Sequence, residues 1–199
     1  FFYKLHIALV NFKLRHICVF SIKKVMKSVK NIVFLGMMGS GKTTIGSLVS
    51  KKLNLNFFDV DEYIEKKIGE KISKIFDKRG EKFFRDIEEK MTLEILKKKN
   101  AVIALGGGAF INANIRREVL RNHISFWLKL DEKRILKRII KNPKRPIAYN
   151  LSTDKLIQLI KKRTEIYSKA LYSIKCDNMS KTDIVKKVIN IYENFKTNH

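Results

Sequence analysis

The stretch from Gly36 to Thr43, which reads GMMGSGKT, constrains this chain more than any other part of it. It matches the phosphate-binding pattern G-x-x-x-x-G-K-[S/T] at every fixed position, and it directly follows the apolar run Ile32-Val33-Phe34-Leu35. The residues after it, up to Leu53, have a helix-like composition. Because this pattern is informative when it joins a strand to a helix, we predict a strand, a loop and a helix here.

Glycines in such a loop let the backbone turn with its N–H groups inward, which makes a concave anion site at a helix N-terminus. Lys42 can then reach the β- and γ-phosphates, and the Thr43 hydroxyl can bind Mg²⁺. The alternative is a glycine-rich turn with a chance lysine. We predict that ATP with Mg²⁺ binds here, on Gly39, Ser40, Gly41, Lys42, Thr43 and Thr44.

From Asn31 onward, short apolar runs alternate with longer helical patterns, which indicates βαβ units and a parallel sheet. The predicted strands are Asn31–Leu35, Asn56–Phe58, Ala101–Leu105, Ile124–Leu130 and Ser173–Cys176. The predicted helices are Thr43–Leu53, Asp61–Ile68, Ser73–Asp77, Glu81–Lys98, Ile115–Arg121, Glu132–Lys141, Thr153–Ser168 and Lys181–Phe195. Asp183 follows Ser180 by three residues, as in a capping box at the start of the last helix.

The 199 residues, 45% of them hydrophobic, are enough for one core, and we expect one domain over residues 31–199. Residues 1–30 contain no acid, carry seven Lys or Arg and begin with Phe. We expect this basic segment to lie outside the fold, as an upstream extension or a fragment artefact. A targeting segment and a structured part of the protein remain open alternatives.

The formal net charge is +24, which suggests either a solvated basic surface or a polyanionic partner. The lysines are spread along helical segments, so we favour the solvated surface and expect no nucleic-acid partner. Cys18 and Cys176 have no metal-ligand spacing and indicate a reducing compartment without disulfides. The longest apolar stretches are too short to span a bilayer, and we expect a cytoplasmic, monomeric protein.

Two of the predicted strands end in unusual residues, at the sheet edge where open α/β sheets bind ligands. One ends in Asp59-Val60-Asp61, and the next in Gly106-Gly107-Gly108. One aspartate could hold Mg²⁺ through water while the other accepts a proton from an acceptor hydroxyl; alternatively, Asp61 only caps the helix that follows. The glycines would let a ligand approach the main chain closely, or they form a flexible turn.

Three arginines are candidates for binding an anionic substrate. Arg85 lies one helical turn before Glu88, which could orient it, and a guanidinium grips a carboxylate with two parallel bonds. Taken alone, Arg85 and Arg163 would be surface ion-pair residues. Arg145 lies in a basic segment with the only two prolines, Pro143 and Pro146, which predict a loop between two helices that could act as a lid over a nucleotide.

Taken in order, the phosphate loop, the two aspartates, Phe84-Arg85, the glycine triplet and Arg145-Pro146 make the chain resemble the shikimate kinases, over about residues 31–195. The resemblance implies an α/β P-loop kinase of three layers, with a five-stranded parallel sheet, helices on both faces and a lid loop. It also implies ATP-dependent phosphorylation of the 3-hydroxyl of shikimate in aromatic amino acid biosynthesis.

The resemblance assigns a role to each candidate residue. Lys42 is implied as the phosphate-binding lysine, Thr43 as a Mg²⁺ ligand, Asp59 as a residue that reaches Mg²⁺ through water, and Asp61 as the shikimate-binding base. Arg85 and Arg163 are implied to hold the substrate carboxylate near Gly106, Gly107 and Gly108. Arg145 is implied to stabilise the transferring phosphoryl group, and Arg138 to pack on adenine. The segment Asp177-Asn178-Met179-Ser180 lacks the proline of the family's adenine loop.

Two other classes of protein share some of these sequence features. Another small-molecule kinase of the same fold, such as a gluconate kinase, would share the loop and the lid. It would not need two arginines and a glycine triplet converging on a carboxylate. A non-catalytic P-loop protein would be favoured by loss of Lys42 or of both aspartates, and all three residues are present.

Overall fold

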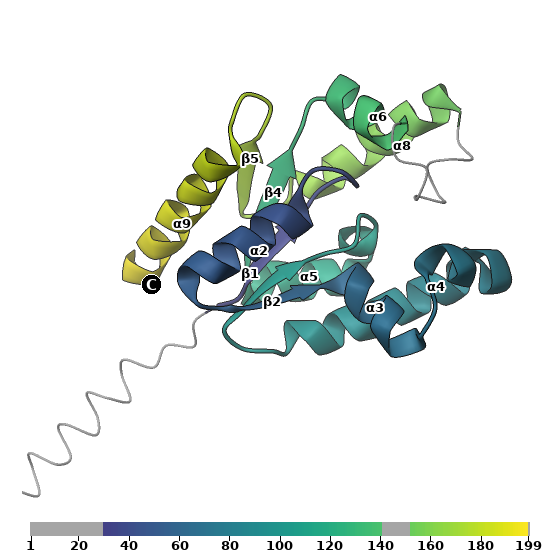
Figure 1. Cartoon of the computed structure of the whole chain (residues 1–199), viewed down its shortest axis with the longest axis horizontal. Coiled ribbons are helices and arrows are strands. Elements are labelled where there is room, and N and C mark those ends of the chain that lie inside the picture. The colour runs from purple at the N-terminus through teal and green to yellow at the C-terminus, as the bar shows by residue number, and fades with distance from the viewer. Residues whose placement is uncertain (1–29, 141–151, 199) are drawn as a thin grey trace, which may run out of the picture.

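The computed structural model describes residues 30–140 and 152–198, which form a five-stranded parallel sheet (Figure 1). The strand order across the sheet is β2-β3-β1-β4-β5. The sequence-based strand positions are confirmed to within two residues at each end, for β1 (Ile32–Leu35), β2 (Asn56–Asp59), β3 (Ala101–Ala104), β4 (Ile124–Lys129) and β5 (Tyr172–Lys175).

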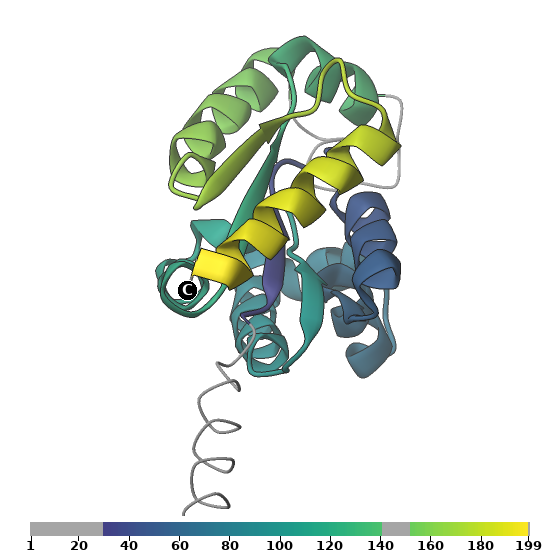
Figure 2. The same cartoon turned by 90° about the vertical axis from the view of Figure 1, so that its left-hand side faces the viewer.

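Helices cover both faces of the sheet (Figures 1 and 2). Connections between parallel strands are right-handed, so helices lie on opposite faces depending on the direction in which the chain crosses the sheet. One face carries α2 (Lys42–Leu53) and α9 (Lys181–Asn198), which pack together; the other carries α4 (Ile72–Leu96), α5 (Ala113–Asn122) and α8 (Thr153–Tyr167). Three shorter elements, α3 (Val60–Ile68), η1 (Ala109–Ile111) and α6 (Glu132–Ile140), complete the described part.

The central strands form the core. Every residue of β1 and β3 is buried, whereas the edge strands β2 and β5 are partly exposed. A strand with helices on both sides has no solvent-facing side, so it reads as a continuous apolar run. Aromatic rings continue this packing across the sheet from β1 through β4 to β5. The ring centroids of Phe34 and Phe126 lie 5.8 Å apart, and those of Phe126 and Tyr172 lie 5.3 Å apart.

The start of α9 agrees with the sequence-based prediction, and the residue that caps α3 differs from the one predicted. The predicted cap is confirmed in one half, because Asp183 N–H donates to Ser180 Oγ at 3.1 Å. The Asp183 carboxylate accepts from the Ser180 hydroxyl at 2.7 Å, where a complete capping box would use the backbone N–H of Ser180. Asp61, however, does not cap α3. Asp59 does, through Oδ1, which accepts from the N–H groups of Asp61 (3.0 Å) and Glu62 (3.3 Å).

The two helices predicted at Ser73–Asp77 and Glu81–Lys98 are parts of one element, α4. The helix is interrupted at Gly80, whose φ of 78° and ψ of 172° are not helical. Such a conformation strains any residue with a Cβ. Glu81 is therefore the first residue after the break, at the start of the second half of α4.

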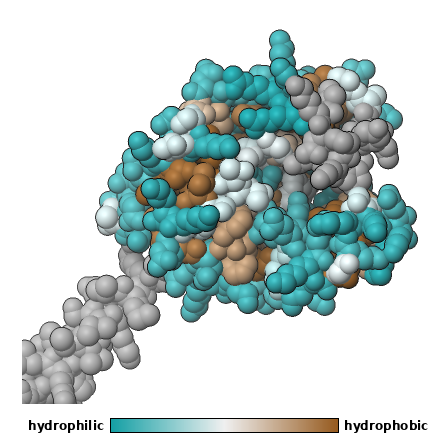
Figure 3. All heavy atoms as spheres, in the orientation of Figure 1, coloured by the Kyte–Doolittle hydropathy of each residue, from teal (hydrophilic) through white to brown (hydrophobic). Residues whose placement is uncertain are grey.

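The surface of the described residues is mainly polar. Figure 3 shows hydrophilic residues over most of one face, with apolar residues in small patches. The large apolar side chains that are most exposed, Leu48, Leu120 and Leu171, come from three separate parts of the chain. None of the described helices is both long enough and apolar enough to cross a membrane.

One buried titratable residue lies far from the carboxyl ends of the strands. His123, between α5 and β4, is 7% exposed, and neither of its ring nitrogens makes a hydrogen bond with the described residues. The nearby carboxylate of Glu118 has Oε1 at 3.6 Å from Nε2. Burial lowers the pKa of His123 below its ordinary value, although Glu118 acts in the opposite direction.

Acid should therefore destabilise the fold through His123. Its pKa is lower in the folded state than in the unfolded chain, where a histidine pKa is about 6.5. The stabilisation is complete above about pH 6.5 and is lost as the pH falls toward the folded-state pKa. We expect His123→Leu to reduce the difference in unfolding free energy between pH 7.5 and pH 5.5, measured by urea denaturation. An unchanged difference would contradict this role for His123.

Candidate active site

The phosphate loop turns tightly between β1 and α2. Gly36, Gly39 and Gly41 have φ values of 140°, 80° and 98°, which residues with a Cβ rarely adopt. At Gly36 a Cβ would also lie 2.9 Å from the carbonyl oxygen of Leu128. Lys42 is buried beneath the loop, and its Nζ donates to the carbonyls of Gly36 (3.0 Å) and Met37 (3.1 Å). The loop and its lysine are thus preorganised as the pattern predicts.

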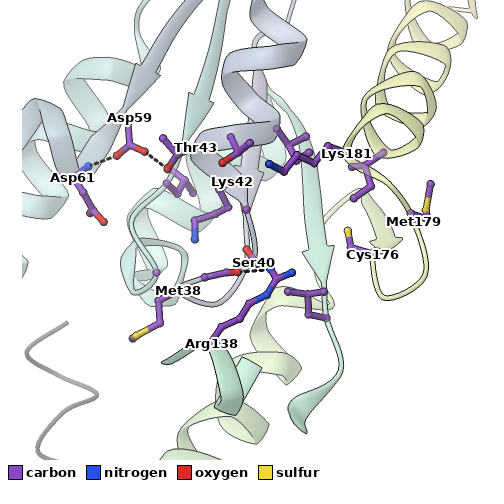
Figure 4. Close-up of a pocket in the computed structure, with 18 residues that line it drawn as sticks. Met38, Ser40, Lys42, Thr43, Asp59, Asp61, Arg138, Cys176, Met179 and Lys181 are labelled. Carbon is purple, nitrogen blue, oxygen red and sulfur yellow. Dashed lines mark hydrogen bonds between the residues drawn. The ribbon is translucent and has the colours of Figure 1, made fainter. Parts of the chain in front are cut away.

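The end of β2 lies against this loop. Thr43 Oγ1 donates to Asp59 Oδ2 at 2.6 Å, so the two predicted metal ligands are in direct contact (Figure 4). The other oxygen of Asp59 caps α3 and thereby fixes the carboxylate. A hydroxyl and a carboxylate beside a phosphate-binding loop fit the oxygen ligands that Mg²⁺ prefers, with phosphate oxygens and water completing its coordination.

The glycine triplet after β3 runs between several site residues. A Cβ on Gly106 would lie 2.6 Å from Asp61 Oδ1 and 2.7 Å from Glu88 Oε1. One on Gly107 would lie 3.4 Å from the backbone nitrogen of Met38 in the phosphate loop. One on Gly108 would lie 2.9 Å from Cζ of Arg85. The sequence predicts that a ligand approaches this main chain closely. In the structure the side chains of Asp61, Glu88 and Arg85 approach it closely.

Arg85 is held by two carboxylates on its own helix. Its Nη1 donates to Glu88 Oε2 at 2.6 Å, which confirms the predicted pair, and Glu88 is 3% exposed. Burial raises the pKa of Glu88, while the neighbouring charge of Arg85 works against that shift. Sequence reasoning missed the second partner, Glu81, which accepts from Nε and Nη2 of Arg85.

Arg163 on α8 is buried and lies beside the triplet, with Nη1 3.8 Å from the position of a Cβ on Gly107. One turn later, Tyr167 donates its hydroxyl to the carbonyl oxygen of Gly107. Burial raises the pKa of Tyr167 to about 12, so its proton is retained at neutral pH. Tyr167 was missed in the sequence, although its spacing of four from Arg163 places both on one helix face.

Two cavities border neighbouring residues of the triplet. The first, of about 450 Å³, is lined by the phosphate loop, both aspartates and Gly107. The second, which we call the arginine cavity, has about 360 Å³ and is lined by Arg85, Glu88, Gly108 and Arg163, among others. The structure therefore brings Lys42, Asp61, Arg85 and Arg163 to one edge of the sheet.

The far end of the first cavity is formed by residues from the later part of the chain. Figure 4 shows the two aspartates on one side of Lys42, and Arg138, Cys176 and Met179 on the other. Arg138 donates to the carbonyl oxygen of Gly39 at 2.8 Å. Cys176, Met179, Lys181 and Ile184 line this end as well. Met179 belongs to the segment compared in the sequence with the family's adenine loop, whereas no role was predicted for the other three. Burial raises the pKa of Cys176 to about 11, so the thiol stays protonated.

One predicted site residue, Arg145, lies in the segment 141–151, outside the described residues together with the predicted lid loop. The other candidates, including Ser40 and Thr44 in the first cavity, are all described.

The parallel sheet, the phosphate loop and the cavities at its edge define a P-loop kinase of the nucleoside-monophosphate-kinase-like fold. A deoxyadenosine kinase from M. mycoides shares this fold, with a TM-score of 0.53 at 18% identity. The family model "Shikimate kinase" matches residues 38–193. The chain belongs to the shikimate kinase family.

Relatives of known name agree with this membership. The shikimate kinase of Thermodesulfovibrio yellowstonii is 41% identical over 165 residues, which cover 82% of this chain and 95% of the relative. That of Bacillus subtilis is 38% identical over 162 residues, covering 80% and 87%. The structure of the Acinetobacter baumannii enzyme in complex with shikimate has a TM-score of 0.80 at 32% identity, and covers 87% of this chain and 98% of that one.

The contact between Gly108 and Arg85 can be tested by adding one methyl group. We expect Gly108→Ala to displace the guanidinium of Arg85 and to raise the KM of the acceptor substrate ten- to a hundredfold, corresponding to about 1.5–3 kcal/mol for a charged hydrogen bond. The KM for ATP should stay the same, because the phosphate loop is untouched.

The matched control is Gly69→Ala. Nothing lies within 4 Å of a Cβ at Gly69, and its φ of 75° should cost only stability. A Gly108→Ala enzyme with the wild-type acceptor KM would show that the close approach has no role in binding.

Proposed function

We propose that this protein transfers the terminal phosphoryl group of ATP to the 3-hydroxyl of shikimate, as a step of aromatic amino acid biosynthesis. The observation that supports this most directly is that the phosphate-loop cavity and the arginine cavity border neighbouring glycines of the triplet, Gly107 and Gly108. A hydroxyl on a ring whose carboxylate is held in the arginine cavity would be directed toward the phosphate loop. Family membership supports the substrate, and the geometry is compatible with the division of roles that the resemblance implies.

On the nucleotide side, the inward N–H groups of the loop and the ammonium of Lys42 bind the phosphates. Thr43 and Asp59 hold Mg²⁺, whose positive charge offsets the charge of the phosphates when it is bound. Arg138, which already contacts the loop at Gly39, lies against the nucleotide base at the far end of the cavity. Arg145 completes the site from the lid loop and stabilises the transferring group.

On the acceptor side, Arg85 and Arg163 bind the carboxylate of shikimate, and the backbone of the triplet borders the ring. Asp61 belongs to the first cavity and lies beside Gly106, between the two binding regions. It accepts the proton of the 3-hydroxyl as the oxygen attacks. Tyr167 keeps its proton and positions the triplet through Gly107.

Three further proposals concern the whole protein. Residues 1–30 lie outside the catalytic domain, whose first described strand begins at Ile32. The enzyme works as a monomer, and it acts in the cytoplasm. Light scattering should give a mass near 23.3 kDa, the mass of one chain.

The substrate can be tested by measuring ADP release with shikimate, gluconate and a set of nucleoside monophosphates, each supplied alone with ATP and Mg²⁺. We expect turnover with shikimate only, because it combines a ring hydroxyl with a carboxylate that two arginines can hold. Turnover with gluconate and none with shikimate would favour the other small-molecule kinases of this fold.

Asp61→Asn tests the proposed base. The amide keeps the shape of the side chain and cannot accept the proton, so we expect kcat to fall by about 10²- to 10⁴-fold while ATP affinity is retained. ATP affinity can be followed by titration with a fluorescent ATP analogue. A kcat close to that of the wild type would remove the base role from Asp61.

A further inference from the structure

Arg85 presents two different sides to its two carboxylate partners. Glu88 accepts from Nη1 at 2.6 Å, whereas a single oxygen of Glu81 accepts from both Nε (3.2 Å) and Nη2 (3.0 Å). The edge formed by Nε and Nη2 can bind a carboxylate through two parallel hydrogen bonds. Glu81 therefore occupies an edge of Arg85 that is suited to binding a carboxylate.

The two partners also differ strongly in burial. The side chain of Glu88 is 4% exposed, and that of Glu81 is 62% exposed. Removing a partner from a buried ion pair is costly, whereas an exposed ion pair contributes little. Glu88 is thus a lasting support for Arg85, and Glu81 is a partner that can be replaced.

The position of Glu81 permits such a replacement. It directly follows Gly80, where the backbone of α4 leaves the helical conformation, with a φ of 78°. No atom of the described residues lies within 4 Å of a Cβ at Gly80, so the space beside this position is open. Glu81 also lines the arginine cavity beside Lys162 and Arg163, where its negative charge opposes the entry of an anion.

We infer that Glu81 acts as an internal stand-in for the substrate carboxylate, which must displace it from Arg85 before the acceptor is bound. The inference rests on the proposed function, because it assumes that the acceptor carries a carboxylate. Glu81 keeps the guanidinium oriented and neutralised in the free enzyme, and it lowers the affinity for the acceptor. Glu81 is a positioning residue, since it acts through Arg85.

Glu81→Gln tests this competition, because it removes the charge while keeping the size of the side chain. We expect the dissociation constant for shikimate, measured by isothermal titration calorimetry, to fall about two- to fivefold, the range that an exposed ion pair would give. The KM for shikimate should fall in the same proportion, with kcat and the KM for ATP unchanged. Glu81→Ala, which leaves no glutamate acceptor for Nε and Nη2 of Arg85, should show the same direction of change.

Asp86→Asn is the matched control, because it removes an exposed negative charge next to Arg85 on the same helix and outside both cavities. It should leave the affinity for shikimate unchanged. An equal gain in affinity in this variant would mean that the effect of Glu81 comes from its net charge and not from its contact with Arg85, which would contradict the inference. Unchanged or weaker binding of shikimate by both Glu81 variants would overturn the inference. A wild-type enzyme that binds no shikimate would instead overturn the proposed function, and the inference with it.

Discussion

The backbone from Gly106 to Gly108 contacts a carboxylate pair, the phosphate loop and a guanidinium within three residues. A Cβ at Gly106 would clash with Asp61 and Glu88, and one at Gly108 would clash with Arg85, whereas one at Gly107 would lie at an ordinary contact distance from Met38. Gly107 lines the first cavity and Gly108 lines the arginine cavity, so the regions proposed for the phosphates and for the acceptor border neighbouring residues of one backbone segment.

Several cations that we assign to ligand binding are already hydrogen-bonded to the protein. Lys42 donates to two carbonyls of its own loop, Arg138 to the carbonyl of Gly39, and Arg85 to two glutamates. Such contacts satisfy donors that would otherwise be desolvated without partners. These contacts also hold the side chains near the cavities. An anionic ligand would therefore replace a contact that already exists, and few side chains would have to be ordered on binding.

Much of this arrangement could be predicted from the sequence, because parallel strands place their carboxyl ends at one edge of a sheet. The phosphate loop, Asp59, Asp61, the glycine triplet and Arg85 each follow a strand or lie on a helix whose pattern is clear. The pair of Arg85 with Glu88 was predictable as well, since a spacing of three is a neighbour contact on a helix.

Other features depend on tertiary contacts that no local pattern contains. The capping of α3 by Asp59 in place of Asp61 depends on one residue of register at the end of β2. The residues at the far end of the first cavity come from β5 and α9, and their role follows from how α9 packs on α2. Glu81 is an exception, because its pair with Arg85 at a spacing of four is a local helix contact that the sequence contains and that was overlooked. Tyr167 acts through the main chain of Gly107, for which there is no sequence signal.

Asp59 joins two tasks in one carboxylate, because one oxygen begins α3 and the other contacts Thr43. Losing a helix cap of this kind costs about 1 kcal/mol of stability. Most replacements of Asp59 would therefore lower the abundance of the protein as well as change its chemistry. In a mutational scan, selection for soluble expression and selection for growth without aromatic supplements should both reject changes at Asp59. Asparagine, which also caps helices well, is the substitution at which the two selections would diverge.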